Sequence, residues 1–213
     1  MYISNSKRLK KVIVNLLRNP SFLIPYLKFS LSSKSPIELE LPWWTFRSIN
    51  KIKSQLNKEK TVFEWGTGGS SIFLAKYVKT ILSVENDPIW IKKVRSKLKQ
   101  KNLSNAAIIH REINLESPES FQNSPYAKSI SATFDIIIID GEDAFGGDSA
   151  WSAREICFEI SQKSIKKNGG IIIVDDSWRY PEILKVTKAE HVVCTESVGP
   201  CRKGVTSTDL HYY

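Results

Sequence analysis

The chain of 213 residues is long enough for one α/β domain with a large core, and short for two. Its 41% hydrophobic and 25% charged residues exclude wholesale disorder, and no segment approaches the roughly 18 consecutive apolar residues that a bilayer-spanning helix needs. The net charge of +9 belongs to residues 1–60, which carry 12 Lys or Arg and 3 acidic residues, whereas residues 61–213 carry 19 of each.

The first 35 residues form a basic, amphipathic leader, and a single domain is predicted over residues 36–213. Lys10–Arg18 is predicted to be a short helix, because Pro20 and Pro25 interrupt any longer one. A basic segment on a neutral domain predicts contact with an anionic surface, which would be membrane lipid, nucleic acid or an acidic glycan. A solubilising, partly mobile leader explains the same charge equally well.

Two features of the sequence predict a cytoplasmic protein. The uncharged run Asn19–Leu27 is too short and too broken by proline for a signal core, and no small-residue cleavage site follows it. The three cysteines lack metal-ligand spacing and cannot all pair, which fits a reducing compartment; they are Cys157, Cys194 and Cys201. If the leader touches lipid, the protein would lie peripherally at the inner membrane face.

After a loop at Ser30–Pro36 and a helix predicted to open at Pro42, strands and helices alternate along the chain. This alternation is typical of a mostly parallel sheet that is covered on both faces. The predicted strands are Thr61–Glu64, Thr80–Glu85, Ala106–His110, Phe134–Asp140 and Ile171–Val174. The predicted helices between them are Ser70–Val78 with Ser70 as N-cap, Pro88–Lys101, and about Ser149–Lys167.

The end of the chain has a different pattern. His191–Val198 and Val205–His211 are strand-like runs, and the six residues between them are too few for a helical crossover. The two runs are therefore predicted to pair antiparallel. A parallel sheet that closes in such a hairpin disagrees with the simplest dinucleotide-binding fold.

A glycine-rich segment lies between the first strand and the following helix, with the sequence Glu64-Trp65-Gly66-Thr67-Gly68-Gly69-Ser70-Ser71. Glycines there let the backbone turn tightly and approach a ligand. Glu85 ends the next strand, 21 positions after Glu64, at the spacing where a carboxylate accepts hydrogen bonds from the ribose of an adenosine. The alternative is a plain tight turn beside two surface or helix-capping carboxylates.

The charge near this segment indicates which adenosine cofactor it suits. A nicotinamide cofactor needs Gly-x-Gly-x-x-Gly or Ala, and position 71 is Ser. Glu64 would repel a diphosphate but suits the cationic end of S-adenosylmethionine. The sequence therefore favours S-adenosylmethionine over a nicotinamide cofactor.

From about Pro42 to its end, the chain resembles the class I S-adenosylmethionine-dependent methyltransferases. The resemblance rests on Glu64-x-Gly66-x-Gly68, Val84-Glu85-Asn86-Asp87, Phe134–Gly141 and Asn168–Asp176. It implies a three-layer αβα sandwich whose seven-stranded, mostly parallel sheet ends in an antiparallel C-terminal hairpin. It also implies that Glu64, Gly66 and Gly68 line the methionine part of the cofactor and that Glu85 binds its ribose. Ser70 stands where the family has a third glycine, and it is counted among the expected cofactor-binding residues.

A narrower resemblance is to small bacterial methyltransferases of largely unassigned substrate. It rests on Leu41-Pro42-Trp43-Trp44, Phe63-Glu64-Trp65-Gly66, and the closing Gly199-Pro200 with Thr206-Ser207-Thr208. The chain has six tryptophans, several of them next to the predicted cofactor loops. These side chains would stack on adenine or on a sugar ring, or simply pack in the core.

Asp140, Asp175 and Asp176 follow two adjacent predicted strands, so their carboxylates should meet at the edge of the sheet where open α/β proteins bind ligands. They could hold a divalent cation such as Mg²⁺, as a similar arrangement does in the catechol O-methyltransferase group, where an Asn stands in place of Asp176. We favour the simpler interpretation, in which Asp140 contacts the cofactor and no metal is bound.

The predicted reaction is direct methyl transfer to an oxygen of a sugar, glycan or other small hydroxyl acceptor. A general base or metal ligand would come from Asp140, Asp143, Asp175 and Asp176, with Glu142 and Asp148 as further loop acids. Nucleic acid is not the expected acceptor, because Asp140-Gly141-Glu142-Asp143 stands where amino-methylating enzymes carry an Asn- or Asp-Pro-Pro-Tyr-type motif. The alternative function is a non-catalytic module of the same fold that contacts an anionic polymer or a membrane.

Overall fold

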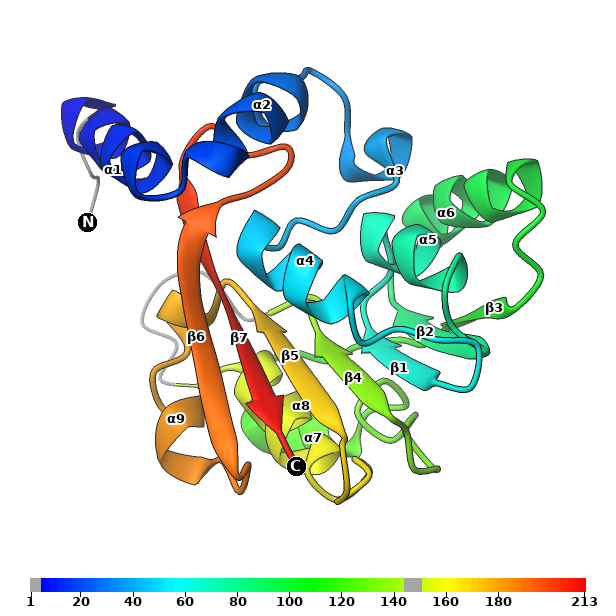
Figure 1. The fold of residues 1–213 in the computed structure, drawn as a ribbon. Helices are drawn as coiled ribbons and strands as arrows, with labels where there is room; N and C mark the ends of the chain where they lie inside the picture. The colour runs from blue at the N-terminus through cyan, green and yellow to red at the C-terminus, as the bar shows by residue number, and fades with distance from the viewer. Residues whose placement is uncertain (1–4, 144–150) are drawn as a thin grey trace.

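The computed structural model describes residues 5–143 and 151–213 (Figure 1). The α-helices are α1 (Asn5–Arg18), α2 (Leu23–Pro25), α3 (Pro36–Leu39), α4 (Phe46–Lys53), α5 (Gly69–Ala75), α6 (Pro88–Gln100), α7 (Pro118–Asn123), α8 (Ala153–Ser161) and α9 (Ile183–Val186). The strands are β1 (Thr61–Trp65), β2 (Thr80–Glu85), β3 (Ala106–His110), β4 (Ile136–Ile139), β5 (Ile171–Asp175), β6 (His191–Val198) and β7 (Val205–Tyr212). Short 3₁₀ turns at Pro20–Phe22 and Ser177–Arg179 and a π turn at Tyr26–Ser30 complete the elements.

In the described part of the chain, seven strands form one sheet in the order β3-β2-β1-β4-β5-β7-β6. The first five are parallel, and β7 lies antiparallel between β5 and β6, which confirms the predicted sheet and its closing hairpin. Asp175 at the end of β5 is paired with Thr208 in the middle of β7, so the first residues of β7 extend beyond the end of β5. The β6–β7 connection therefore returns to the edge where the parallel strands end.

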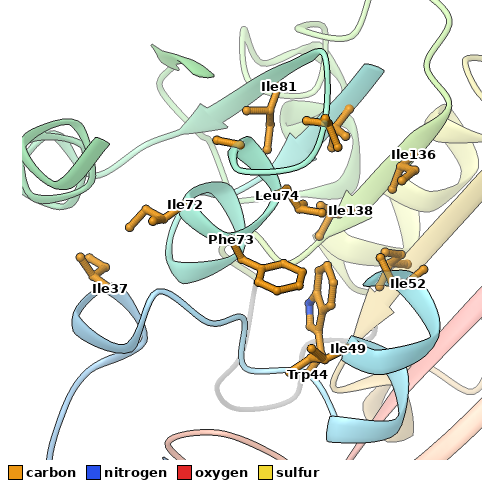
Figure 2. Packing of buried hydrophobic residues seen from close by; sticks show 14 of the residues in the cluster. Ile37, Trp44, Ile49, Ile52, Ile72, Phe73, Leu74, Ile81, Ile136 and Ile138 are labelled. Atoms are coloured by element: carbon orange, nitrogen blue, oxygen red, sulfur yellow. The ribbon is translucent and has the colours of Figure 1, made fainter. Parts of the chain in front are cut away.

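Each face of the sheet carries its own hydrophobic core, because side chains of a strand alternate between the two faces. In β4, Ile136 and Ile138 face the core formed with α4, α5 and α6, whereas Ile137 and Ile139 face the core formed with α7, α8 and α9. Figure 2 shows the first core, where Trp44 lies beside side chains of α4, α5 and β4. These two covered faces are the predicted three-layer sandwich.

The leader packs on the sheet domain at the end of the hairpin. Val12, Phe22 and Tyr26 are buried in the first core. The Tyr26 hydroxyl donates to the carbonyl oxygen of Lys203 at 3.0 Å, and the Ser30 hydroxyl donates to that of Gly199 at 2.7 Å. These contacts cross the division predicted at residue 35.

No helix of the described chain has the length and apolarity that crossing a bilayer requires.

Two predicted helix starts are wrong because side-chain hydroxyls decide them. The helix predicted to open at Pro42 begins at Phe46, since the Thr45 hydroxyl accepts from the Ser48 amide and caps it. The helix predicted to start with Ser70 as N-cap begins one residue earlier, at Gly69. The Ser70 hydroxyl donates instead to the Glu64 carboxylate.

Other predicted bounds are wrong because tertiary contacts replace helix continuation. The helix predicted over about Ser149–Lys167 ends at Ser161, where the following residues pair with Phe134: the Phe134 amide donates to Ser164, and the Lys166 amide donates back to Phe134. The predicted start at Ser149 lies outside the described residues. The leader helix begins at Asn5 rather than at Lys10.

Candidate functional site

A cavity of about 390 Å³ lies at the carboxyl edge of the parallel strands. One side is formed by the β1–α5 loop, the end of β2 and the start of α6, and the other by the ends of β4 and β5, by α8 and by the β6–β7 connection. The residues that line it are Pro36, Trp43, Thr67, Gly68, Gly69, Ser70, Glu85, Asp87, Trp90, Asp140, Gly141, Glu142, Asp143, Arg154, Asp176 and Arg202.

Gly66 and Gly69 shape the β1–α5 loop, because their surroundings leave no room for a side chain. Gly66 has a φ of +92°, and a Cβ atom there would lie 2.8 Å from the carbonyl oxygen of Asp140. A Cβ atom on Gly69 would lie 2.1 Å from the carbonyl oxygen of Leu41. The loop is therefore pressed against β4 on one side and against the segment before α4 on the other.

Glu64 binds the start of α5 on the side away from the cavity. Its side chain is buried, and its carboxyl group accepts hydrogen bonds from the hydroxyls of Ser70, Ser71 and Ser83, the last at 2.8 Å. Burial raises the pKa of Glu64 to about 7, although the three hydroxyls lower it. Glu64 does not belong to the described residues that line the cavity, so a direct contact with a cofactor stays a prediction.

Glu85 faces the cavity from the end of β2. One carboxylate oxygen accepts from the amides of Asn86 and Asp87 at 2.8 and 3.0 Å, and the other accepts from the Thr67 amide at 3.2 Å. Burial raises its pKa, and these three amides oppose the shift. The amides fix the orientation of the carboxylate and tie it to the glycine-rich loop.

Trp90 forms the wall beside Gly68. Asp87 caps α6 by accepting from the amides of Ile89 and Trp90, which positions the first turn of the helix. The indole Nε1 of Trp90 then donates to the carbonyl oxygen of Thr67 at 2.6 Å. A broad aromatic side chain therefore stands next to Glu85 at this end of the cavity.

At the opposite end, two arginines neutralise the acids that follow β4 and β5. Arg154 of α8 lies 3.3 Å from Asp140 and donates to the carbonyl oxygen of Gly141 at 2.8 Å. Arg202 of the β6–β7 connection binds Asp176 at 2.8 Å and Asp175 at 3.1 Å. Its guanidinium also lies over the Trp43 ring, 5.1 Å from the centroid.

The three aspartates differ in what else they can bind. Asp175 is fully buried, does not line the cavity, and also accepts from the Thr208 hydroxyl at 3.3 Å. Burial raises the pKa of Asp140, which has Arg154 as its close cationic partner. The pKa of Asp176 is lowered. Burial acts to raise it, but the Arg202 guanidinium and a hydrogen bond from the Thr206 hydroxyl outweigh the effect of burial.

Among residues 5–143 and 151–213, no group of three or more His, Cys, Asp or Glu side chains is arranged to hold an ion. Asp175 and Asp176 direct carboxylate oxygens to Arg202, and Asp140 directs one to Arg154, so each of these acids has an arginine of the protein as its cationic partner.

Asp143 lines the cavity but serves as a structural acceptor. Its two carboxylate oxygens accept from the Ala153 amide at 2.7 Å and from the Ser152 hydroxyl at 2.9 Å, at the start of α8. Glu142 lines the cavity beside it. Asp148, which the sequence also offered as a loop acid, lies outside the described residues.

Sequence reasoning missed Arg202 and gave Trp43 no specific role. Arg202 lies in the β6–β7 connection, outside the motif residues Gly199-Pro200, and it reaches the cavity only because the hairpin returns to the carboxyl edge of β5. The hairpin was predicted from the sequence. An arginine in its connection could therefore have been predicted to lie near the acids at the end of β5. Trp43 precedes α4 and meets Arg202 through tertiary packing, for which the sequence carries no local signal.

No family model matches the chain, and no curated protein matches it. Solved structures do. An O-methyltransferase from Streptomyces achromogenes involved in tomaymycin synthesis, in complex with S-adenosylmethionine, is 15% identical, with a TM-score of 0.57 over 96% of this chain and 97% of that one. An O-methyltransferase from Bacillus cereus in complex with S-adenosylhomocysteine is 17% identical, with a TM-score of 0.55 over 99% and 91%.

An rRNA methylase from Streptococcus thermophilus is 13% identical, with a TM-score of 0.53 over 85% of this chain and 98% of that one. The shared architecture covers nearly the whole chain in the O-methyltransferase pairs. The chain has the class I methyltransferase fold. Within this methyltransferase fold, the cavity lies where β1, β2, β4 and β5 end, with Glu85 at one end and the Asp140–Arg154 pair at the other.

Proposed function

We propose that the chain is an S-adenosylmethionine-dependent methyltransferase that methylates a hydroxyl oxygen of a small molecule or glycan. The observation that carries this proposal is the division of one cavity into two chemically different ends. Glu85, Gly68 and Trp90 form one end, and Asp140 with the Arg202–Asp176 pair forms the other. The first end has the groups for a nucleoside, and the second has the groups for a polar acceptor.

The Glu85 end suits the donor. A carboxylate that three backbone amides hold in place can accept hydrogen bonds from the two hydroxyls of a ribose. Gly68 leaves the backbone open to a ligand, and the Trp90 ring offers a flat apolar face for adenine. When bound, S-adenosylmethionine would supply an electrophilic methyl group on a sulfonium centre.

Asp140 is the best-placed general base at the acceptor end. Asp143 is engaged by α8, Asp175 is buried away from the cavity, and Asp176 has a lowered pKa. Asp140 faces the cavity and has a raised pKa. As the acceptor oxygen forms its bond to the methyl carbon and the carbon–sulfur bond breaks, Asp140 would take the hydroxyl proton.

The charge of the acceptor end supports a hydroxyl compound rather than nucleic acid. Four acids line this end of the cavity against two arginines, because Arg154 and Arg202 pair with Asp140 and Asp176. The remaining negative charge disfavours a phosphate backbone. Trp43, with the Arg202 guanidinium over its ring, offers a flat surface for a sugar or another ring. A small or glycan acceptor therefore fits this cavity better than a polynucleotide does.

Isothermal calorimetry with S-adenosylmethionine and S-adenosylhomocysteine tests the donor half of the proposal, with NAD as the comparison ligand. We expect binding of the first two and none of NAD. Transfer of a labelled methyl group to cell fractions then tests the reaction. Cofactor binding without transfer to any fraction would favour the alternative function, a non-catalytic binding module, whereas absence of cofactor binding would refute the methyltransferase proposal.

A further inference from the structure

Exposed apolar side chains are concentrated in the leader. Of the thirteen large hydrophobic side chains that are exposed in the described chain, eight lie within residues 9–31. Leu17 and Ile24 are 77% and 75% exposed, more than any other large hydrophobic residue described. We call this set the leader patch; it consists of Leu9, Ile13, Val14, Leu17, Leu23, Ile24, Leu27 and Leu31.

The structure holds the leader patch outward. Leu9, Ile13 and Leu17 follow each other at intervals of four residues, so they form one stripe along α1. Another side of the helix is fixed to β6, where the Asn15 amide group donates to the Glu196 carbonyl oxygen at 3.2 Å and accepts from the Ser197 hydroxyl at 3.0 Å. The stripe therefore cannot turn inward without breaking these bonds.

The second half of the leader patch is fixed in the same way. Phe22, Tyr26 and Ser30 recur every four residues and are buried, and the last two bind the β6–β7 connection. Between them, Leu23, Ile24 and Leu27 are left exposed. Figure 1 shows α1 and α2 in blue at one end of the molecule, beside this connection.

The same segment is strongly basic. Residues 1–35 contain seven Lys or Arg and no acidic residue. On α1, helical geometry places Lys7, Lys10 and Arg18 next to the apolar stripe, and all three are exposed. Lys28 lies beside Leu27 in the second half and is also exposed.

We propose that the leader patch binds the surface of a lipid bilayer that contains anionic phospholipids. A helix lying in the interface buries its apolar stripe among the acyl chains while flanking cations contact the headgroups, and the leader has both components. Nucleic acid would neutralise the cations but leave the leucines in water. A second copy of the chain would cover the leucines but bring two basic segments together.

Vesicle flotation of the full chain tests this proposal, with vesicles of phosphatidylcholine alone and of phosphatidylcholine with phosphatidylglycerol at about 3:1. We expect binding to the anionic vesicles at least about tenfold stronger than to the neutral ones, and weaker binding in high salt. Equal binding to both kinds of vesicle, or binding to neither, would overturn the proposal.

Paired variants assign the binding to the leader patch. Leu17→Gln with Ile24→Gln should lower binding by about tenfold or more, whereas Ile89→Gln with Leu184→Gln, exposed apolar residues elsewhere, should leave it unchanged. Lys7→Gln with Lys10→Gln should also weaken binding, and Lys92→Gln with Lys167→Gln should do so less. Circular dichroism melting checks that each variant is folded.

Further outcomes separate the competing occupants. If gel filtration gives a dimer that the Leu17→Gln and Ile24→Gln variant dissociates, and vesicles do not bind, the patch is an interface between copies and the proposal is wrong. Tight binding of RNA without vesicle binding would refute it too. Because flotation needs no methyl donor, its result stands apart from the proposed methyltransferase function.

Discussion

Glu64 is a buried acid whose ionisation opposes folding. Its pKa is about 7 in the folded protein, compared with an ordinary value of 4.5, so the folded state binds more protons than the unfolded state between these two pH values. Its contribution to stability is full below pH 4.5 and is lost as pH rises through 7. The hydroxyls of Ser70, Ser71 and Ser83 reduce this cost but do not remove it.

We therefore expect Glu64→Gln to flatten the pH dependence of stability. Relative to the variant, the protein with Glu64 should lose about 3 kcal/mol of unfolding free energy between pH 4.5 and 8, because the pKa of Glu64 rises from 4.5 to about 7 on folding. Urea denaturation at a series of pH values measures the difference. A constant difference across this range would mean that Glu64 does not titrate there.

Glu85 carries the donor half of the proposed function. If Glu85 binds the ribose as proposed, Glu85→Ala removes the acceptor for its hydroxyls, and we expect S-adenosylmethionine affinity to fall by about 10- to 100-fold in calorimetry. Glu112→Ala, an exposed acid beyond β3, is the control and should bind normally. Unchanged affinity in Glu85→Ala would remove this residue from the cofactor site.

Asp140 carries the acceptor half. The proposed base works when its carboxyl group is ionised, so kcat should rise with pH through the raised pKa of Asp140, about 6. Asp140→Asn should lower kcat by about 100-fold or more and abolish this rise. Rate measurements at saturating donor and acceptor between pH 5 and 8 check both points. A variant that keeps the rise would show that another group supplies the base.

At the scale of elements, the β6–β7 connection is fitted closely to the segment before α4. A Cβ atom on Gly199 would lie 2.3 Å from the Trp44 carbonyl oxygen, whereas one on Gly204 would find its nearest neighbour, Arg8, at 3.8 Å. The two glycines of one connection therefore differ in what their surroundings allow. That contrast provides a matched pair of substitutions.

Gly199→Ala should lower the unfolding free energy by about 1–3 kcal/mol, because backbone must move to accept the methyl group. Gly204→Ala should be neutral or stabilising by about 0.4–1 kcal/mol, since it restricts the unfolded chain without a clash. Thermal and urea denaturation of both variants measure this. Equal effects would mean that the connection adjusts freely around Trp44.

Element order followed from the sequence, but element ends did not. The unbroken apolar runs of β4 and β5 and the six-residue hairpin connection gave the parallel strands and the antiparallel closure. Helix starts depended on competition between hydroxyls: Thr45 capped α4 where Pro42 was expected to open it. Short helices such as α7 and α9, stabilised by tertiary packing on the second core, had no periodic signal to reveal them.

At the scale of the whole molecule, the sequence predicted a site at the carboxyl edge of the sheet, but not every residue that lines the cavity there. Gly68 and Glu85 line the cavity, whereas Gly66 does not, and a contact of any of them with a cofactor stays a prediction. Glu64 lies behind the loop, because three serines enclose it. Arg202 could not be placed from its neighbours in sequence, since its contacts with Asp175 and Asp176 exist only after the hairpin returns to the sheet edge.

The hydrogen bonds between the leader and the β6–β7 connection make two distant parts of the chain one mechanical unit. The Tyr26 hydroxyl donates to the carbonyl oxygen of Lys203, and the Cys201 amide donates to that of Phe29. Lys203 and Cys201 are the neighbours of Arg202 in the chain. Deletion of residues 1–35 would remove the contacts that hold the residues on both sides of Arg202. The ion pair between Arg202 and Asp176 would then be weaker. Removing the leader would thus disturb the acceptor end even in a test tube without lipid, whereas a point change such as Leu17→Gln leaves those anchors in place.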